Sequence, residues 1–198
     1  VPTNKKPTTV PNEKNYPVCP PGAMSIENFT DKCTACHLCV SACPTRVIQP
    51  SYLEYGLFGI MQPHLDYHTN FCNFECTICS EVCPTGAILP LTLEEKKLTQ
   101  IGVVTFLIEN CIVYTDNTDC GACSEHCPTK AVDMKPYKDN LSIPTINTDI
   151  CIGCGACEYA CPTTPYKAIY VDGNAFHKQA EKPKNKKIDV DVEEDFPF

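Results

Sequence analysis

The chain has 198 residues, a formal net charge of −8 and 17 cysteines, a cysteine count far above that of an ordinary globular protein. The acidic balance provides no basic surface for nucleic acid. Only 9% of the residues are aromatic and 18 are prolines, which argues against a large continuous hydrophobic core. The longest apolar run, residues 101–108, is far shorter than the roughly 20 residues of a membrane-spanning helix, so we expect no membrane span in this chain.

The N-terminal part predicts a flexible segment followed by one short helix. Residues 1–18 are rich in Pro, Thr, Asn and Lys and predict a flexible leader. Cys19 stands alone, fourteen residues before the next cysteine, and we expect an unligated thiol there. Ser25 is a good N-cap and Glu27 suits a first turn, so a helix is predicted over residues 25–31.

Four cysteine motifs, each closed by a Cys-Pro dipeptide, follow in the chain. They are motif 1 (Cys33, Cys36, Cys39, Cys43), motif 2 (Cys72, Cys76, Cys79, Cys83), motif 3 (Cys111, Cys120, Cys123, Cys127) and motif 4 (Cys151, Cys154, Cys157, Cys161). Motifs 1 and 4 have the spacing C-x-x-C-x-x-C-x-x-x-C-P, in which three thiolates bind one [4Fe–4S] cluster and the fourth usually reaches a second cluster. Sixteen cysteines in four such sets predict four [4Fe–4S] clusters, and we expect the chain without metal to be largely unfolded.

Other uses of cysteine fit the pattern less well. The odd cysteine count and the close spacing disfavour a disulfide scaffold. A structural zinc site needs only two C-x-x-C pairs and does not require the repeated Cys-Pro.

In motif 3 the first gap holds residues 112–119, so Asp119 or His126 could replace a displaced Cys111. Cys111 is favoured because thiolate suits iron–sulfur better than carboxylate or imidazole.

The segments between the motifs predict an α+β fold that is rich in loops. Short β-prone stretches cover residues 103–108, 131–134, 142–146 and 168–172. A capping box at residues 92–95 predicts a helix through Leu98. The aromatic-rich insertion at residues 51–70 could form a partner surface, although packing is favoured. We expect two bacterial ferredoxin-like units with hairpins and short helices, at residues 19–100 (motifs 33–44 and 72–84) and 101–175 (motifs 111–128 and 151–162), and a charged tail at 176–198.

The chain resembles the MauM/NapG ferredoxin-type proteins. The resemblance rests on Pro20-Pro21-Gly22-Ala23 before motif 1, Cys83-Pro84-Thr85-Gly86-Ala87-Ile88 at the end of motif 2, the widened first gap of motif 3, and Cys-Ile-Gly-Cys-Gly-Ala-Cys at 151–157. It implies a relay of four [4Fe–4S] clusters that carries electrons between a quinol-oxidising membrane protein and a soluble redox enzyme. It also implies that all sixteen motif cysteines are ligands and that the protein works in the periplasm; a cytoplasmic or membrane-attached soluble domain is the alternative.

The sequence leaves two questions open, one about the function of the chain and one about which motifs share a cluster. The leading interpretation is an electron-transfer protein without catalytic residues of its own, since the sequence has no dinucleotide fingerprint and no phosphate-binding loop. The alternative is an iron–sulfur subunit of an oxidoreductase in which an incompletely ligated cluster at motif 3 takes part in chemistry. The order of strands and motifs favours pairing motif 1 with 2 and motif 3 with 4, whereas a nested arrangement would pair 2 with 3 and 1 with 4.

Overall fold

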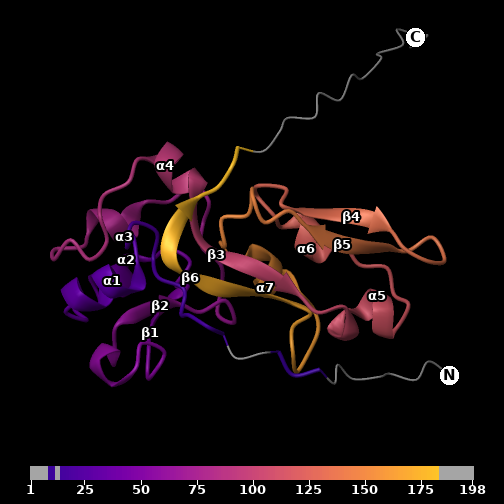
Figure 1. Ribbon diagram of the computed structural model, residues 1–198, viewed down its shortest axis with the longest axis horizontal. Helices are drawn as coiled ribbons and strands as arrows, with labels where there is room; N and C mark the ends of the chain where they lie inside the picture. Colours follow the sequence, from indigo (N-terminus) through magenta and orange to yellow (C-terminus); the bar gives the residue numbers. More distant parts are fainter. Residues whose placement is uncertain (1–8, 12–13, 183–198) are drawn as a thin grey trace, which may run out of the picture.

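The computed structural model describes residues 9–11 and 14–182 (Figure 1). The α-helices of this part are α1 (Ile26–Lys32), α2 (Leu38–Ala42), α3 (Ile78–Glu81), α4 (Leu93–Leu98), α5 (Ile112–Thr115), α6 (Ala122–Glu125) and α7 (Ala156–Ala160). Its strands are β1 (Ile48–Pro50), β2 (Pro63–Leu65), β3 (Thr99–Phe106), β4 (Val132–Pro136), β5 (Ser142–Ile146) and β6 (Ile169–Gln179), and two 3₁₀ turns are η1 (Leu57–Gly59) and η2 (Ile108–Asn110). The predictions for residues 1–8, 12–13 and 183–198 lie outside the described residues.

The strands pair into small antiparallel sheets, β1 with β2, β3 with β6, and β4 with β5. The predicted α+β class is therefore confirmed. The hairpin of β4 and β5 lies between motifs 3 and 4 as predicted, and β5 has the predicted bounds. Strand β3 begins earlier than predicted, at Thr99, and the predicted strand end at residue 108 is wrong because η2 begins at Ile108.

Two helices form where the sequence carries local capping signals. The Ser25 hydroxyl accepts a hydrogen bond from the Asn28 amide at 3.0 Å and begins α1. Thr92 and Glu95 form the predicted capping box of α4, in which the side chain of each accepts a hydrogen bond from the backbone amide of the other. Helix α4 ends where β3 begins, so these caps also fix the entry to the β3–β6 sheet.

Residues 14–18 pack against β6, which corrects the predicted flexible leader for this stretch. The Tyr16 amide donates to Asp172 Oδ1 at 3.2 Å, and the Gly173 amide donates to the Tyr16 carbonyl at 3.1 Å. A Cβ atom on Gly173 would lie 2.2 Å from the carbonyl oxygen of Pro17, so only glycine allows this approach. Strand β6 continues to Gln179 and therefore runs past residue 176, where the tail was expected to begin.

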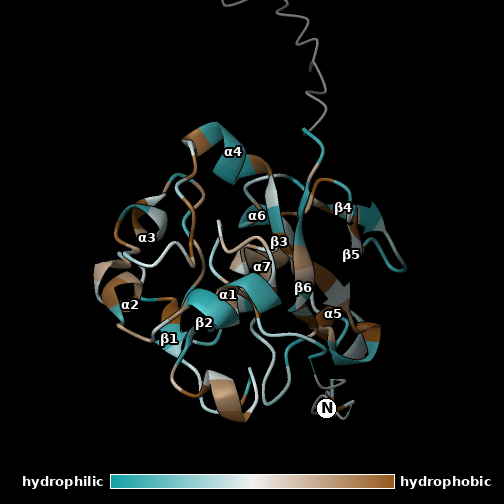
Figure 2. Ribbon diagram, turned by 60° about the vertical axis from the view of Figure 1, so that its left-hand side comes forward, coloured by the Kyte–Doolittle hydropathy of each residue, from teal (hydrophilic) through white to brown (hydrophobic). Residues whose placement is uncertain are grey.

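The buried core contains many of the motif cysteines together with a few large side chains. Phe29 and Tyr67 are the largest fully buried hydrophobic residues, and both contact this cysteine-rich cluster. Helix α7, which carries Cys157 of motif 4, lies near the middle of the molecule in both ribbon views (Figures 1 and 2). The hydrophobic core is thus assembled around the cysteine loops, and buried side chains of β3 and β6 such as Ile101, Val104 and Val171 belong to the same cluster.

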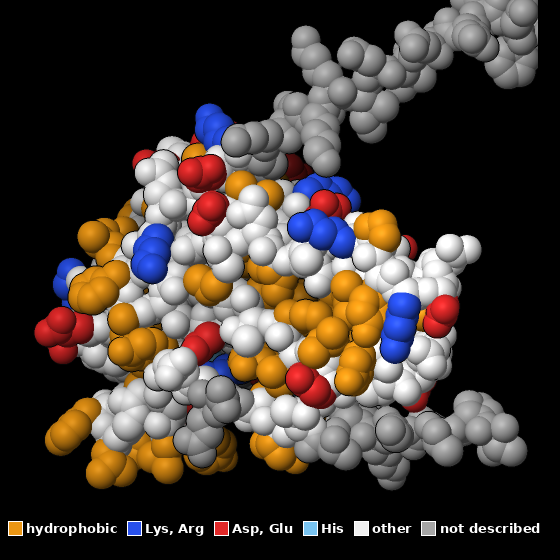
Figure 3. Space-filling view, turned by 45° about the vertical axis from the view of Figure 1, so that its right-hand side comes forward, with side chains coloured by type: hydrophobic (Ala, Val, Ile, Leu, Met, Phe, Trp, Pro, Cys, Tyr) orange, Lys and Arg blue, Asp and Glu red, His pale blue; other side chains and the backbone are white. Residues whose placement is uncertain are grey.

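The aromatic-rich insertion at residues 51–70 is divided between core and surface. Tyr55 and Tyr67 pack inside, as expected, whereas Tyr52 is 79% exposed and Phe58 is fully exposed. Figure 3 shows hydrophobic side chains gathered along the lower left edge of the molecule, the side on which Figure 1 places β1 and β2. Among the described residues, none of the helices has the length and apolar character that crossing a bilayer requires.

Candidate metal centres

The structure gathers the motif cysteines into four groups, each built from three cysteines of one motif and the last cysteine of another. These groups are site 1 (Cys33, Cys36, Cys39 and Cys83), site 2 (Cys72, Cys76, Cys79 and Cys43), site 3 (Cys111, Cys120, Cys123 and Cys161) and site 4 (Cys151, Cys154, Cys157 and Cys127). The four sulfurs of each of sites 1, 2 and 3 line one small cavity. Motif 1 thus exchanges its last cysteine with motif 2, and motif 3 exchanges its last cysteine with motif 4.

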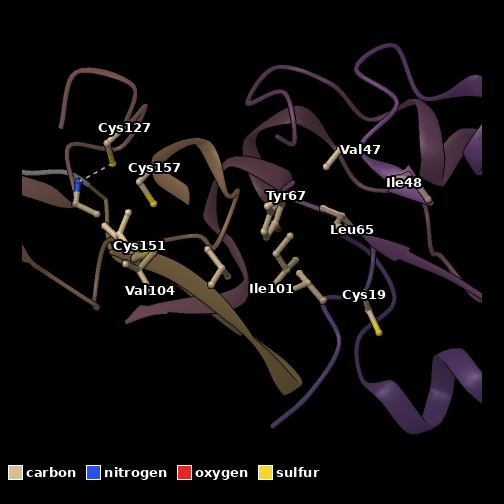
Figure 4. Packing of buried hydrophobic residues seen from close by; sticks show 14 of the residues in the cluster. Cys19, Val47, Ile48, Leu65, Tyr67, Ile101, Val104, Cys127, Cys151 and Cys157 are labelled. Carbon is tan, nitrogen blue, oxygen red and sulfur yellow. Dashed lines mark hydrogen bonds between the residues drawn. The ribbon is translucent and has the colours of Figure 1, made fainter. Parts of the chain in front are cut away.

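Site 4 is the most deeply buried part of this arrangement. Figure 4 shows Cys127 beside Cys151 and Cys157, with Val104 of β3 close by. Burial raises the pKa of the Cys157 thiol, and the neighbouring sulfurs of Cys154, Cys151 and Cys127 raise it further. The Cys157 thiol therefore remains protonated at neutral pH unless a metal takes the place of its proton.

The long gap of motif 3 does not displace its first cysteine. Cys111 is 7% exposed and lines site 3 with Cys120 and Cys123. The inserted residues 112–119 form α5 and a surface loop, which returns the chain to the site. Asp119 is absent from the lining of site 3, and His126 is exposed, with its Nδ1 2.9 Å from the Ala122 carbonyl oxygen. Neither alternative ligand is placed at this site.

A threonine contacts the last cysteine of every motif, a feature that the sequence analysis missed. The sulfur-to-hydroxyl distances are 3.6 Å for Cys43–Thr45, 3.7 Å for Cys83–Thr85, 3.7 Å for Cys127–Thr129 and 3.2 Å for Cys161–Thr163. The signal was present in the sequence, because all four motifs end in Cys-Pro-Thr. Each cysteine that crosses to the neighbouring site thus has a hydroxyl donor two residues further along the chain.

Backbone amides supply further hydrogen bonds to these crossing cysteines. The Ile88 amide donates to the Cys83 sulfur at 3.4 Å, and the Ala131 amide donates to the Cys127 sulfur at 3.2 Å. Burial acts to raise the pKa of the Cys83 thiol, but the amide and hydroxyl donors together lower it below the ordinary value. A sulfur surrounded by such donors is stabilised as a thiolate, which is the form that binds iron.

The cysteine groups suit a polynuclear cluster better than a single ion. Among the described residues, no three His, Cys, Asp or Glu side chains are placed to hold one metal ion together. Sites 1, 2 and 3 instead have four sulfurs around a cavity, which provides one thiolate for each iron of a [4Fe–4S] cluster. When bound, such a cluster supplies one-electron redox chemistry, and the residues described above would hold it and exclude water.

Sites 2 and 4 meet where the two halves of the chain touch. The Cys72 amide donates to the Cys154 carbonyl at 2.9 Å, which links a loop of each site directly. Tyr67 is 1% exposed, and its hydroxyl donates to the Gly153 carbonyl at 2.5 Å. Figure 4 shows Tyr67 between the site 4 cysteines and Leu65, next to Val47 and Ile48 of the first half. The loops of motifs 2 and 4 are therefore joined by a backbone hydrogen bond. Tyr67, which precedes motif 2 in the chain, adds a side-chain hydrogen bond to the motif 4 loop.

Comparison with known proteins agrees with this geometry. Residues 32–88 and residues 118–165 each match a 4Fe-4S dicluster domain family. The chain is 26% identical over 152 residues to the ferredoxin-type protein NapF of Escherichia coli K12, which covers 77% of this chain and 84% of NapF. It is 35% identical over 148 residues to the methylamine utilization ferredoxin-type protein MauM of Methylophilus methylotrophus, and 32% identical to MauM of Methylobacillus flagellatus. These two alignments cover 72% of this chain, and 65% and 62% of the respective relatives.

The fold, the cysteine groups and the domain matches define a ferredoxin-type iron–sulfur protein of the electron-transfer class, with [4Fe–4S] clusters as its cofactors. The chain belongs to the MauM/NapG-type ferredoxin family, as its motif order predicted.

Proposed function

We propose that this chain is an electron-transfer protein that holds four [4Fe–4S] clusters, one at each of sites 1 to 4, with the sixteen motif cysteines as ligands. The observation that carries the proposal is the exchange of the last cysteine between motifs 1 and 2 and between motifs 3 and 4. This exchange is the arrangement of two-cluster ferredoxins, so the chain corresponds to two ferredoxin-like units in series. Catalysis is not part of its own role.

The residues of the chain arrange the four sites in the order 1, 2, 4, 3. Sites 1 and 2 are neighbours because they exchange Cys43 and Cys83. Sites 3 and 4 are neighbours because they exchange Cys127 and Cys161. The hydrogen bond between the Cys72 amide and the Cys154 carbonyl supports sites 2 and 4 as the inner pair of this order. The outer sites 1 and 3 are then the two places at which partners would give and take electrons.

The partners in this proposal are redox proteins, one of which oxidises quinol in a membrane while the other is a soluble redox enzyme. The resemblance to the MauM/NapG proteins supports this pair and an extracytoplasmic location. The alternative, an oxidoreductase subunit with an open iron at motif 3, is less well supported because Cys111 lies with Cys120, Cys123 and Cys161 around site 3. A labile three-iron form in freshly prepared protein would favour that alternative.

Replacement of one crossing cysteine tests the proposal. In Cys127→Ser we expect the cluster held by Cys151, Cys154 and Cys157 to be damaged, because Cys127 lies at site 4. Cys19→Ser serves as the matched control, since Cys19 belongs to no site. The measurement is iron content with electron paramagnetic resonance spectra of the anaerobically reduced protein. Damage to the cluster of Cys72, Cys76 and Cys79 would instead support nested pairing and contradict the proposal.

A further inference from the structure

Lys96 is a buried lysine whose charge has no acidic partner among the described residues. It lies on α4 and is 3% exposed, and no Asp or Glu in the described part of the chain forms an ion pair with it. Its neighbour Lys97 is partly exposed and pairs with Glu75 at 3.3 Å and with Glu94 at 3.8 Å. Burial of an unpaired ammonium group is costly, so Lys96 requires a source of negative charge nearby.

The Lys96 ammonium faces the loop that carries the first cysteine of site 2. Its Nζ donates a hydrogen bond to the Asn73 carbonyl and lies 5.7 Å from the centre of the Phe74 ring. Burial raises the pKa of the adjacent Cys72 thiol, and the charge and hydrogen bonding of Lys96 oppose that rise. The nearest negative charge available to Lys96 is therefore the sulfur of Cys72 in its thiolate form.

A cluster with four thiolate ligands carries a net negative charge, because the thiolates outweigh the positive iron–sulfur core, and each added electron makes it more negative. A fixed positive charge beside one ligand sulfur stabilises the reduced state more than the oxidised state. The effect is strong where water is excluded, since charges interact more strongly at low dielectric constant. The charge of the surroundings and hydrogen bonds to sulfur are recognised determinants of iron–sulfur reduction potentials.

We propose that Lys96 is a positioning residue for electron transfer that raises the reduction potential of the cluster at site 2 above the value this site would otherwise have. The inference rests on the proposed function, because it requires a cluster at site 2. The electron that reduces this cluster comes from a redox protein partner and passes on to the next site. The capping box at Thr92 and Glu95 holds the helix that presents Lys96.

Three variants of the complete, cluster-loaded chain test this inference. Lys96→Met removes the charge at nearly constant volume, and Lys96→Arg keeps the charge. Lys97→Met removes a neighbouring, partly exposed and ion-paired charge that lies 5.4 Å from the same Phe74 ring. The midpoint potentials are measured by reductive titration with chemical mediators, monitored by electron paramagnetic resonance. The signal of site 2 is identified by its change in Cys76→Ser.

We expect Lys96→Met to shift the site 2 potential downwards and to leave the other potentials unchanged. Lys96→Arg should keep the site 2 potential close to that of the wild-type protein, and Lys97→Met should change it little. The shift should persist at high salt, because a buried charge is poorly screened. If Lys96→Met does not retain iron, the same comparison is made with Lys96→Gln.

Two results would contradict the inference, and they are distinguishable. Unchanged potentials in Lys96→Met with full iron content, or an equal shift in Lys97→Met, would overturn the role of Lys96 alone. The absence of a cluster at site 2 in the wild-type protein would overturn the proposed function and this inference with it.

Discussion

Cys19 differs from the motif cysteines in the surroundings of its sulfur. It is 1% exposed, and its Sγ lies 3.3 Å from the Tyr55 hydroxyl. Burial raises the pKa of the Cys19 thiol to about 12, as burial also does for buried motif cysteines such as Cys154, so the pKa does not set Cys19 apart. What distinguishes Cys19 is its position, because it lines none of the cavities of sites 1, 2 and 3 and is not grouped with the cysteines of site 4. We therefore predict that Cys19→Ser retains the full iron content, as measured by metal analysis of the anaerobically purified protein.

The comparison variant for this prediction is Cys36→Ser. Cys36 belongs to motif 1 and lines site 1, so its replacement should remove or destabilise the cluster at that site. A loss of iron in Cys19→Ser equal to one cluster would show that Cys19 is a ligand.

His177 should contribute to loss of stability in acid. Both nitrogens of its ring are buried and have no hydrogen-bond partner among the described residues, and burial lowers its pKa to about 4. The unfolded chain binds this proton near pH 6.5 and the folded chain only near pH 4, so the contribution of His177 to stability is complete above about 6.5 and is lost as the pH falls towards 4. We predict that His177→Leu flattens the fall in melting temperature over this pH range.

His68 is exposed and provides the control for this titration. His68→Leu should leave the acid profile unchanged. If His177→Leu and the wild-type protein lose stability in parallel between pH 6.5 and pH 4, burial of His177 does not govern this range.

At the scale of elements, Gly155 is the residue that lets the two halves of the chain meet. It has φ +79°, and a Cβ atom there would lie 2.1 to 2.3 Å from ring atoms of Tyr67. We predict that Gly155→Ala lowers stability by about 1–3 kcal/mol beyond the cost of the left-handed backbone, because the ring of Tyr67 has no room to move away. The measurement is the melting temperature, together with the rate at which cluster absorbance is lost on heating.

Gly86 is the control for that substitution. Its φ is +70°, and the nearest atom to a Cβ there would be Leu89 Cδ2 at 3.9 Å, an ordinary van der Waals contact. Gly86→Ala therefore also places a Cβ atom at a positive φ, but without the contact to Tyr67. Equal destabilisation by the two substitutions would show that Tyr67 does not restrain the ligand loop of motif 4.

Elements that depend on local signals could be predicted from the sequence, and those that depend on distant partners could not. The capping box of α4 and the N-cap of α1 involve residues three apart, so they are visible in the sequence. The last part of β6 is different, because Lys178 and Gln179 pair with Gln100 and Thr99 across a bulge in β3. Nothing in the sequence near residue 179 signals that pairing.

At the scale of the whole molecule, the sequence identified candidate ligands and favoured sequential over nested sharing of them, from the order of strands and motifs. Spacing alone predicts three cysteines on one loop, whereas the position of the fourth depends on how the loops pack. Cys127 lies beside Cys151 and Cys157, in agreement with the sequential pairing. Lys96 was also missed, because a lysine in a short amphipathic helix is ordinarily a solvated residue.

The charge pattern of the surface also depends on the fold. The net charge of −8 suggests an acidic docking surface, but the face in Figure 3 has Lys and Arg interspersed with Asp and Glu. Hydrophobic side chains such as Leu57 and Phe58 add exposed apolar area to the surface. Composition alone does not give the distribution of these groups, because it records neither neighbours nor exposure.

The central claim, that the chain binds four [4Fe–4S] clusters through sixteen cysteines, is tested most directly by analysis of iron and acid-labile sulfide in anaerobically prepared protein. The account predicts one iron and one sulfide for each motif cysteine, and a chain that loses its fold when the metal is removed. A protein that contains chiefly zinc, or a colourless chain that stays folded without metal, would contradict it.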